Sequence, residues 1–304
     1  MLETNNMFRE LLSNHPDISW LCDAEIKAVQ QCLLNMMDDI DFVCRKHGLT
    51  YWLGGGSMLG AVRHGGFIPW DDDMDIVMPR ADYDRLEALI LNEFPDRYWV
   101  QDVRSDPNYD LSSMKIRRKG TVCLEVLDAD IKKAGIFIDI YPLEDTYDSS
   151  VLRTLHGYLG EVLLLICSCV RLKQKKNVIM KYLSDSRSIR TVKVKCLIGT
   201  LFSFRSLTAW LRTTERVLSR CSNSHSEWVS IPSGRKHYFG EMYHRASFYP
   251  PHEIDFDGHR YFIEHDPEEY LTKLYGDYNK VPDVNEREHH GVLKLSLGNG
   301  DIVK

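Results

Sequence analysis

Carboxylates gather in residues 71–75 (Asp-Asp-Asp-Met-Asp), which lead directly into the apolar run 76–78. We expect that run to be a strand, and residues two apart in a strand share a face, so Asp73 and Asp75 are predicted to project together. Two like charges this close repel each other unless a cation lies between them, and Mg²⁺ commonly uses one or two carboxylates with substrate phosphates. A solvated acidic loop is the alternative. A helix-loop-helix calcium site is excluded, because Ile76 stands where that loop requires glycine.

A further carboxylate, Asp139, lies inside the apolar segment 135–140. An aspartate between isoleucines on a central strand is costly unless something pairs with it. A metal ion shared with Asp73 and Asp75 would do so, and so would a salt bridge to a nearby basic residue. Both readings stay open at this point.

Three glycines and Ser57 follow the predicted strand 51–53. A strand that ends in glycines and leads into a helix presents unsatisfied backbone N–H groups to an anion, and glycine lets a phosphate approach the backbone. Gly55, Gly56 and Ser57 are therefore candidates for binding phosphate. The alternative is a tight turn in which Ser57 caps the helix.

The order of these features is more informative than any one of them. Ser57 precedes Asp73 by sixteen residues, Asp73 and Asp75 are two apart, and Asp139 falls on a later strand. This order is typical of nucleotidyltransferases. Phosphoryl transfer depends mainly on positioning and on neutralising oxygen charge, and two metal ions held by carboxylates can do both.

Residues 51–76, YWLGGGSMLGAVRHGGFIPWDDDMDI, closely resemble the LicD family, which includes bacterial phosphocholine transferases and is related to the fukutin-type ribitol-phosphate transferases. Further family segments are resembled, in the order in which the family has them, by residues 137–143, residues 270–278 and the histidines at 289–290. The resemblance runs from about residue 35 to residue 290. It is loose over 145–235, and it departs from the family pattern at Glu264, where members often carry proline.

The resemblance implies a role for nine residues. The catalytic carboxylates and metal ligands are Asp73, Asp75 and Asp139, and the donor-phosphate contacts are Gly55, Gly56, Ser57, Arg63, His64 and Lys115. For Arg63 and His64 the alternatives are a surface arginine and a helix-ending histidine, and for Lys115 a structural lysine. The implied cofactor is Mg²⁺, one ion or two, with Mn²⁺ as a substitute.

The implied reaction moves a phospho-alcohol group from a CDP-activated donor, CDP-choline by default, to a sugar hydroxyl of a cell-surface glycan such as a lipopolysaccharide or teichoic acid, and releases CMP. The expected partners are this donor and a glycan or lipid-linked glycan acceptor. One alternative is a nucleotidyltransferase that acts on a small acceptor and releases pyrophosphate. Another is a non-catalytic binding homologue, although such a protein has no physical reason to keep crowded carboxylates.

The helices and strands expected around these residues indicate an α/β (α+β) fold. It would consist of a mixed sheet flanked by helices, with an additional helical segment and a C-terminal hairpin. Apolar spacing and end signals predict helices over 23–47, from 57, over 80–94 and over 267–275. Strands are predicted at 51–53, 76–78, 98–103, 114–118, 121–126 and 135–141, the last closed by Pro142, with a hairpin at 257–258. We divide the chain into a catalytic core (1–145), a basic helical segment (146–225) and a C-terminal part that completes the substrate site (226–304).

Charge is distributed unevenly along the 304 residues. The net charge is −6, which gives no sign of nucleic-acid binding, yet residues 171–220 hold 13 Lys and Arg against two acidic residues, so the rest of the chain carries −17. This segment suits an anionic partner and predicts peripheral membrane contact; a solvated helical face is the alternative. The sequence has no secretory signal, no apolar run near 18 residues and no CxxC pair among its eight cysteines. We therefore expect a cytoplasmic protein with reduced thiols, located at the inner face of the membrane.

Overall fold

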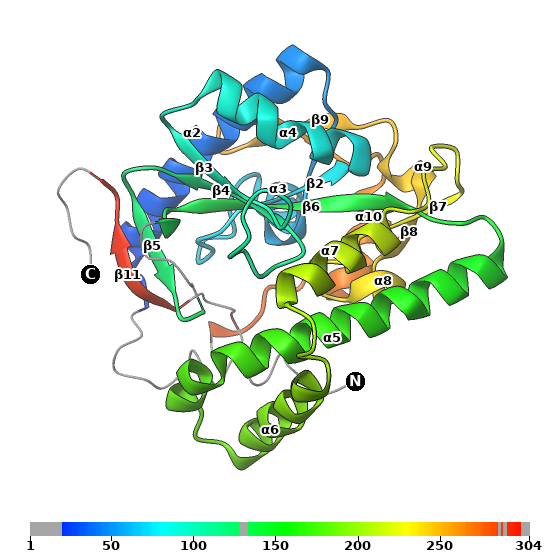
Figure 1. Cartoon of the computed structure of the whole chain (residues 1–304). Coiled ribbons are helices and arrows are strands. Elements are labelled where there is room, and N and C mark those ends of the chain that lie inside the picture. Colours follow the sequence, from blue (N-terminus) through cyan, green and yellow to red (C-terminus); the bar gives the residue numbers. More distant parts are fainter. Residues whose placement is uncertain (1–19, 128–132, 285–286, 288–290, 299–304) are drawn as a thin grey trace.

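The computed structural model describes residues 20–127, 133–284, 287 and 291–298, and within them helices flank a curled mixed sheet, as predicted (Figure 1). The helices are α2 (Asp23–His47), α3 (Gly55–His64), α4 (Arg80–Glu93), α5 (Ser150–Tyr182), α6 (Ser186–Leu201), α7 (Leu207–Leu218), α8 (His237–Gly240), α9 (Arg245–Phe248) and α10 (Pro267–Tyr275). The strands are β1 (Trp52–Leu53), β2 (Asp75–Pro79), β3 (Tyr98–Gln101), β4 (Met114–Arg118), β5 (Val122–Glu125), β6 (Phe137–Asp145), β7 (Trp228–Ser230), β8 (Met242–His244), β9 (His252–Phe256), β10 (His259–Ile263) and β11 (Val292–Ser296).

The main sheet has the strand order β1-β2-β6-β4-β3. Strands β2 and β6 run parallel, whereas β1 with β2, β6 with β4 and β4 with β3 are antiparallel. The far end of β6 continues into a ladder with β7, which in turn pairs with β8. Strand β6 is therefore central, and a polar residue near its start is flanked by two other strands.

Several predicted elements are confirmed because their end signals are local. Helix α2 spans 23–47 as predicted: Glu25 accepts a hydrogen bond from the Cys22 amide at 2.7 Å at its start, and Gly48 ends it with a φ of 63°. Helix α10 and the β9–β10 hairpin across Asp257-Gly258 also lie where the pattern predicts them.

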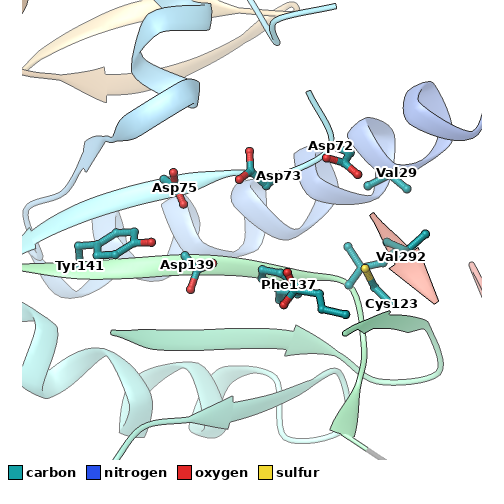
Figure 2. Close-up of a pocket in the computed structure, with 11 residues that line it drawn as sticks. Val29, Asp72, Asp73, Asp75, Cys123, Phe137, Asp139, Tyr141 and Val292 are labelled. Atoms are coloured by element: carbon teal, nitrogen blue, oxygen red, sulfur yellow. The ribbon is translucent and has the colours of Figure 1, made fainter. Parts of the chain in front are cut away.

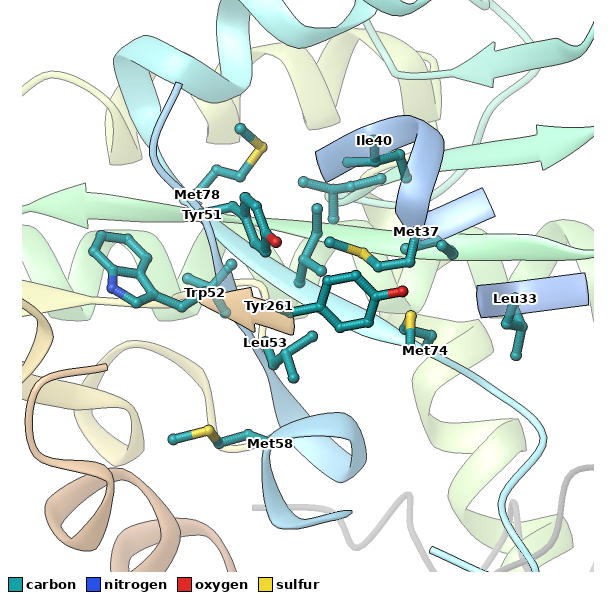
Figure 3. Close-up of a cluster of buried hydrophobic side chains, with 14 of the residues drawn as sticks. Leu33, Met37, Ile40, Tyr51, Trp52, Leu53, Met58, Met74, Met78 and Tyr261 are labelled. Atoms are coloured by element: carbon teal, nitrogen blue, oxygen red, sulfur yellow. The ribbon is translucent and has the colours of Figure 1, made fainter. Parts of the chain in front are cut away.

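A single large apolar cluster joins α2, β1, β2 and the β9–β10 hairpin (Figure 3). Met37 and Ile40 of α2 are fully buried in it, as are Trp52 of β1 and Met78 of β2. Tyr261 is buried too, and its hydroxyl donates to Asp38 on α2 at 2.9 Å, so its polar end is satisfied. This cluster holds the start of β2 rigidly beside β6.

Two strand predictions need correction. Strand β6 does not close at Pro142 but runs to Asp145. Pro142 sits between the part of β6 that pairs with β4, which ends at Ile140, and the part that pairs with β7, which begins at Glu144, so its missing N–H leaves no gap in either ladder. Strand β2 contains the predicted run 76–78 and begins at Asp75, but Asp73 lies in the connection before it, so the strand argument for a shared face does not extend to Asp73.

The basic segment is helical, as its apolar residues predict. It comprises the second half of α5 together with α6 and α7. Contrary to the expectation from the sequence, α5 is long and apolar enough to span a membrane, with a mean hydropathy of 1.5 over 18 residues, but half of that window is buried inside the fold. Helix α7 packs on α5, so α5 is a structural helix of this fold with one face exposed.

Glu264, which directly follows β10, has no exposed surface, and neither carboxyl oxygen has a hydrogen-bond partner within the described residues. Burial raises the pKa of this carboxyl to about 8. The folded protein therefore holds the neutral, protonated form over a pH range in which the unfolded chain has already released the proton.

We expect Glu264→Gln to remove a pH dependence of stability. Because the folded pKa is raised, the stability contribution of the protonated group is complete below the unfolded pKa and is lost as pH rises toward 8. Between pH 5 and pH 9, the free energy of unfolding measured in urea should decrease for the wild type by about 4 kcal/mol more than it does for Glu264→Gln. Parallel profiles for the two proteins would contradict the burial of an unpartnered carboxyl.

Candidate active site

Strand register brings two of the predicted carboxylates together. Asp75 at the start of β2 is the register partner of Asp139 on β6, and the Asp139 amide donates to the Met74 carbonyl at 3.1 Å. On the other side, the Gly54 amide donates to the Asp75 carbonyl at 2.8 Å. The backbone that carries these carboxylates is thus hydrogen-bonded on both sides, and residues 64 positions apart in the chain share one edge.

The glycines at the start of α3 pack directly on the acidic run. A Cβ on Gly55 would lie 2.4 Å from Asp75 Oδ2, and one on Gly56 would lie 2.6 Å from Asp71 Oδ2. Gly55 also has a φ of +49°, a conformation that side chains disfavour. Only glycine therefore lets the positive end of α3 come this close to the carboxylates.

Ser57 has a different position from the one expected. Gly54 is the N-cap of α3, so Ser57 lies inside the helix and is only 2% exposed. Its hydroxyl accepts a hydrogen bond from the Asp75 amide at 3.0 Å. In this structure Ser57 holds the start of β2 against α3, and it does not line either of the cavities described next.

Two cavities meet at the carboxylates, and Asp73, Asp75 and Tyr141 line both of them. The first, of about 200 Å³, is shown in Figure 2 and extends past Asp139 toward Cys123 and Val292. The second, of about 260 Å³, lies on the side of the glycines. Its lining residues are Gly55, Gly56, Ile68, Trp70, Asp71, Asp73, Asp75, Val77, Tyr141, Ile231, Gly234, Arg235, Glu241, Tyr270, Leu274 and Tyr275.

Lys115 pairs with Asp139 across the β4–β6 ladder. The two residues are in register, and Lys115 Nζ lies 3.4 Å from Asp139 Oδ2 and 3.2 Å from Glu125 Oε2. Burial raises the pKa of Asp139, the Lys115 ammonium opposes that rise, and the negative charges of Glu125 and Asp73 add to it. The salt-bridge alternative for Asp139 is thus present in the structure, and Glu125 is a site carboxylate that the sequence analysis missed.

The oxygen donors at this edge match the ligands that Mg²⁺ prefers. The first cavity is lined by four carboxylates, Asp73, Asp75, Asp139 and Glu125. Their negative charges repel one another, and a bound cation would reduce that repulsion. Within the described residues, no three side chains of the His, Cys, Asp and Glu type lie close enough to hold an ion as they stand. The donor set therefore fits the ion in chemistry, and the carboxylates would have to draw together around it.

Arg63 and His64 do not line either cavity. Arg63 Nη1 donates to the Tyr278 carbonyl at 2.9 Å, and its Nε donates to His64 Nε2 at 3.0 Å. The His64 ring also makes an edge contact with Trp70, 6.3 Å between centroids. Here Arg63 fastens the loop after α10 to the end of α3, so a contact with donor phosphate would require it to leave that loop.

The wall of the second cavity comes largely from residues far along the chain. Tyr270 accepts a hydrogen bond from the Gly55 amide at 2.8 Å, so α10 contacts the start of α3. Arg235 supplies a cation, and burial raises the pKa of Glu241 to about 7. The family-like segment 270–278 was the signal that could have identified Tyr270 and Tyr275 from the sequence.

We expect Gly55→Ala to lower the activity of this site at least about tenfold, because the methyl group would displace Asp75. Gly48→Ala is a matched control, since Gly48 has a φ of +63° but no atom within 4 Å of its Cβ position. Both variants should lose about 1–2 kcal/mol of stability from backbone strain. Equal initial rates of transfer in the two variants would show that the close approach of α3 to Asp75 is not required.

A mixed sheet that sets a glycine-initiated helix against carboxylates on neighbouring chain segments supplies the positioning and the charged groups that phosphoryl transfer depends on. Residues 48–154 match the family model described as LicD/FKTN/FKRP, nucleotidyltransferase domain. Residues 48–154 therefore match the nucleotidyltransferase domain of this family, and the predicted resemblance to the LicD family is confirmed.

Similarity to a curated relative extends well beyond that domain. The chain is 25% identical over 278 residues to the lipopolysaccharide cholinephosphotransferase LicD of Haemophilus influenzae, covering 90% of this chain and 98% of the relative. Over 42 residues it is 52% identical to the human ribitol 5-phosphate transferase FKRP, covering 14% of this chain and 8% of the relative. An uncharacterized protein of Rickettsia prowazekii, RP689, is 40% identical over 58 residues, or 19% of this chain and 22% of the relative.

Proposed function

We propose that this protein is a transferase that moves a phospho-alcohol group, phosphocholine by default, from a CDP-activated donor to a hydroxyl of a glycan. The observation that carries the proposal is the meeting of two cavities at Asp73 and Asp75, one lined by the glycines of α3 and the other by Asp139. Two substrates entering from opposite sides would meet at the carboxylates. The similarity to a cholinephosphotransferase along nearly the whole chain supports the same class of reaction.

In the proposed step the acceptor oxygen forms a bond to the phosphorus next to the alcohol, and the bond from that phosphorus to the bridging oxygen of CMP breaks. The donor pyrophosphate would lie in the second cavity, where Gly55 and Gly56 allow close approach and Arg235 supplies positive charge. Asp139 or Asp73 would accept the proton of the attacking hydroxyl. Magnesium, held by Asp73, Asp75 and Asp139, would neutralise phosphate oxygen charge and lower the pKa of that hydroxyl.

The lining of the second cavity bears on which alcohol the donor carries. Of the aromatic residues that can face a quaternary ammonium, Trp70, Tyr141, Tyr270 and Tyr275 line the second cavity. Trp52 and Tyr243, by contrast, are fully buried. An aromatic wall favours choline over glycerol or ribitol as the first donor to test.

The test is CMP release from CDP-choline by the purified protein with Mg²⁺, compared with the same protein in EDTA and with an Asp73→Ala, Asp75→Ala double variant. Slow hydrolysis in the absence of the glycan is enough for detection. CMP release by the wild type with Mg²⁺, and neither in EDTA nor by the double variant, supports the proposal. Comparing the rates with CDP-ethanolamine, CDP-glycerol and CDP-ribitol then identifies the preferred alcohol. No CMP from any of these donors, together with no donor binding, would refute it.

The same protein, assayed also for pyrophosphate release and for thermal stabilisation by nucleotides, separates the alternatives. A nucleotidyltransferase acting on a small acceptor would release pyrophosphate from CTP or ATP and no CMP from CDP-choline. A non-catalytic homologue would release neither product, and thermal stabilisation by none of CDP-choline, CTP and ATP would favour it. A cytoplasmic location and contact of residues 171–220 with the inner face of the membrane belong to this proposal as well, because the acceptor would be lipid-linked.

A further inference from the structure

One face of α5 and α6 exposes an unusual density of large apolar side chains. On α5 these include Val151, Leu155 and Val162, which are 66%, 63% and 53% exposed. On α6 Leu197 and Leu201 are 67% and 70% exposed. Soluble proteins rarely expose contiguous apolar patches of this kind unless the patch meets a partner or a membrane. We use the name α5–α6 face for the surface formed by Val151, Leu155, Leu159 and Val162 of α5 and by Arg190, Lys193, Leu197 and Leu201 of α6.

The apolar stripe of α5 cannot turn inward, because the opposite side of the helix is already packed. A Cβ on Gly157 would lie 2.6 Å from the Tyr238 ring, and one on Gly160 would lie 2.6 Å from Leu218. His156 also bonds to the Val217 carbonyl at 2.7 Å. These close contacts hold the helix against α7 and α8 and leave the stripe pointing away from the sheet.

Helix α6 extends the same face. Cys169 is fourteen residues after Leu155 and therefore lies on the same side of α5, and there α6 packs so closely that a Cβ on Gly199 would lie 2.3 Å from the Cys169 carbonyl. Figure 1 shows α6 beyond α5, on the side away from the sheet. The apolar stripe thus runs beside the end of α6, where Leu201 is exposed.

The charge of this part of the chain is strongly positive. Residues 150–204 contain ten Lys and Arg and two acidic residues, a net charge of +8, whereas the whole chain carries −6. Arg190 and Lys193 are exposed and lie seven and four residues before Leu197, on its side of α6. Basic side chains beside exposed apolar ones are the composition of a helix that lies in the interface of an anionic bilayer.

We propose that the α5–α6 face binds the surface of a bilayer that contains anionic lipids, with α5 lying in the membrane plane rather than crossing it. Half of the apolar window of α5 is buried in protein, so the helix has only one side to offer to lipid. A second copy of the chain fits this face less well, because a two-fold interface would bring the basic α6 helices of both copies together. The inference rests on the membrane contact that the proposed function includes for residues 171–220, and it names the surface and the lipid charge that make this contact; its test does not require the transfer reaction.

The test is sedimentation of the full chain with vesicles of phosphatidylcholine, with and without about 25% phosphatidylglycerol. We expect binding to the anionic vesicles that weakens as salt is raised. Leu155→Glu with Leu159→Glu should lower the partition coefficient at least about tenfold, and Arg190→Glu with Lys193→Glu should lower it severalfold on anionic vesicles only. Leu91→Glu, at a leucine on α4 that is 37% exposed, is the matched control and should bind as the wild type does.

Two results would overturn the proposal. One is a folded wild type that sediments with neither kind of vesicle. The other is a wild-type dimer by light scattering that the Leu155→Glu, Leu159→Glu variant converts to a monomer, which would make the face an interface between copies. Circular dichroism and thermal unfolding establish that each variant is folded. CMP release measured without vesicles should be the same in this variant as in the wild type, so failure of lipid binding and failure of transfer are distinguishable.

Discussion

Replacing Asp75 with asparagine should lower CMP release from CDP-choline at least about a thousandfold, because a transferred phosphoryl group needs its oxygen charge neutralised at the point where the two substrates meet. Asp75 lines both cavities and is the register partner of Asp139. Asparagine keeps the shape of the side chain and leaves the hydrogen bond from the Asp75 amide to Ser57 in place, since that bond uses the backbone. The variant should therefore fold and fail in chemistry.

The measurement is initial CMP release over a Mg²⁺ titration, with thermal stabilisation by CDP-choline as a second readout. Asp255→Asn is the control, because Asp255 lies on β9 with its side chain 87% exposed. That variant should retain wild-type turnover. If Asp75→Asn keeps more than about a tenth of the activity, the carboxylate does not neutralise transition-state charge and the proposed metal site is wrong.

Arg80→Met should cost about 3–5 kcal/mol of stability, because it leaves a buried carboxylate without its partner. Arg80 Nε lies 3.1 Å and 3.2 Å from the two oxygens of Glu144, whose side chain is 1% exposed. Arg80 Nη1 also contacts Glu215 of α7 at 3.1 Å. One guanidinium thus joins the start of α4, the end of β6 and the basic helical segment.

Urea unfolding followed by tryptophan fluorescence measures the effect. Arg85→Met on the same helix is the control: the Arg85 side chain is 53% exposed, and its pair with Asp82 should contribute less than about 1 kcal/mol. An Arg80→Met, Glu144→Met double variant should recover much of the loss, since it removes the unpaired buried charge. If the single variant is as stable as the double variant, Glu144 is not held as a buried anion.

The candidate site residues could be proposed from the sequence because the motif that carries most of them is local. Gly55, Gly56, Asp73 and Asp75 fall within 21 residues, and glycine, carboxylate and apolar spacing each have a direct conformational meaning. Helices α2 and α10 were predictable for the same reason, since their apolar period and their end residues lie within the helix or next to it. Metal binding and catalysis by these residues remain predictions.

The tertiary structure decided what these residues face. Register alone sets Asp75 beside Asp139 and Lys115 opposite Asp139, and no local pattern encodes the pairing of strands so far apart. The Tyr270 hydroxyl reaches the Gly55 amide across 215 positions of the chain. Such contacts depend on how the whole core packs, so the second cavity, the role of Glu125 and the outward apolar face of α5 could be found only once the chain was folded.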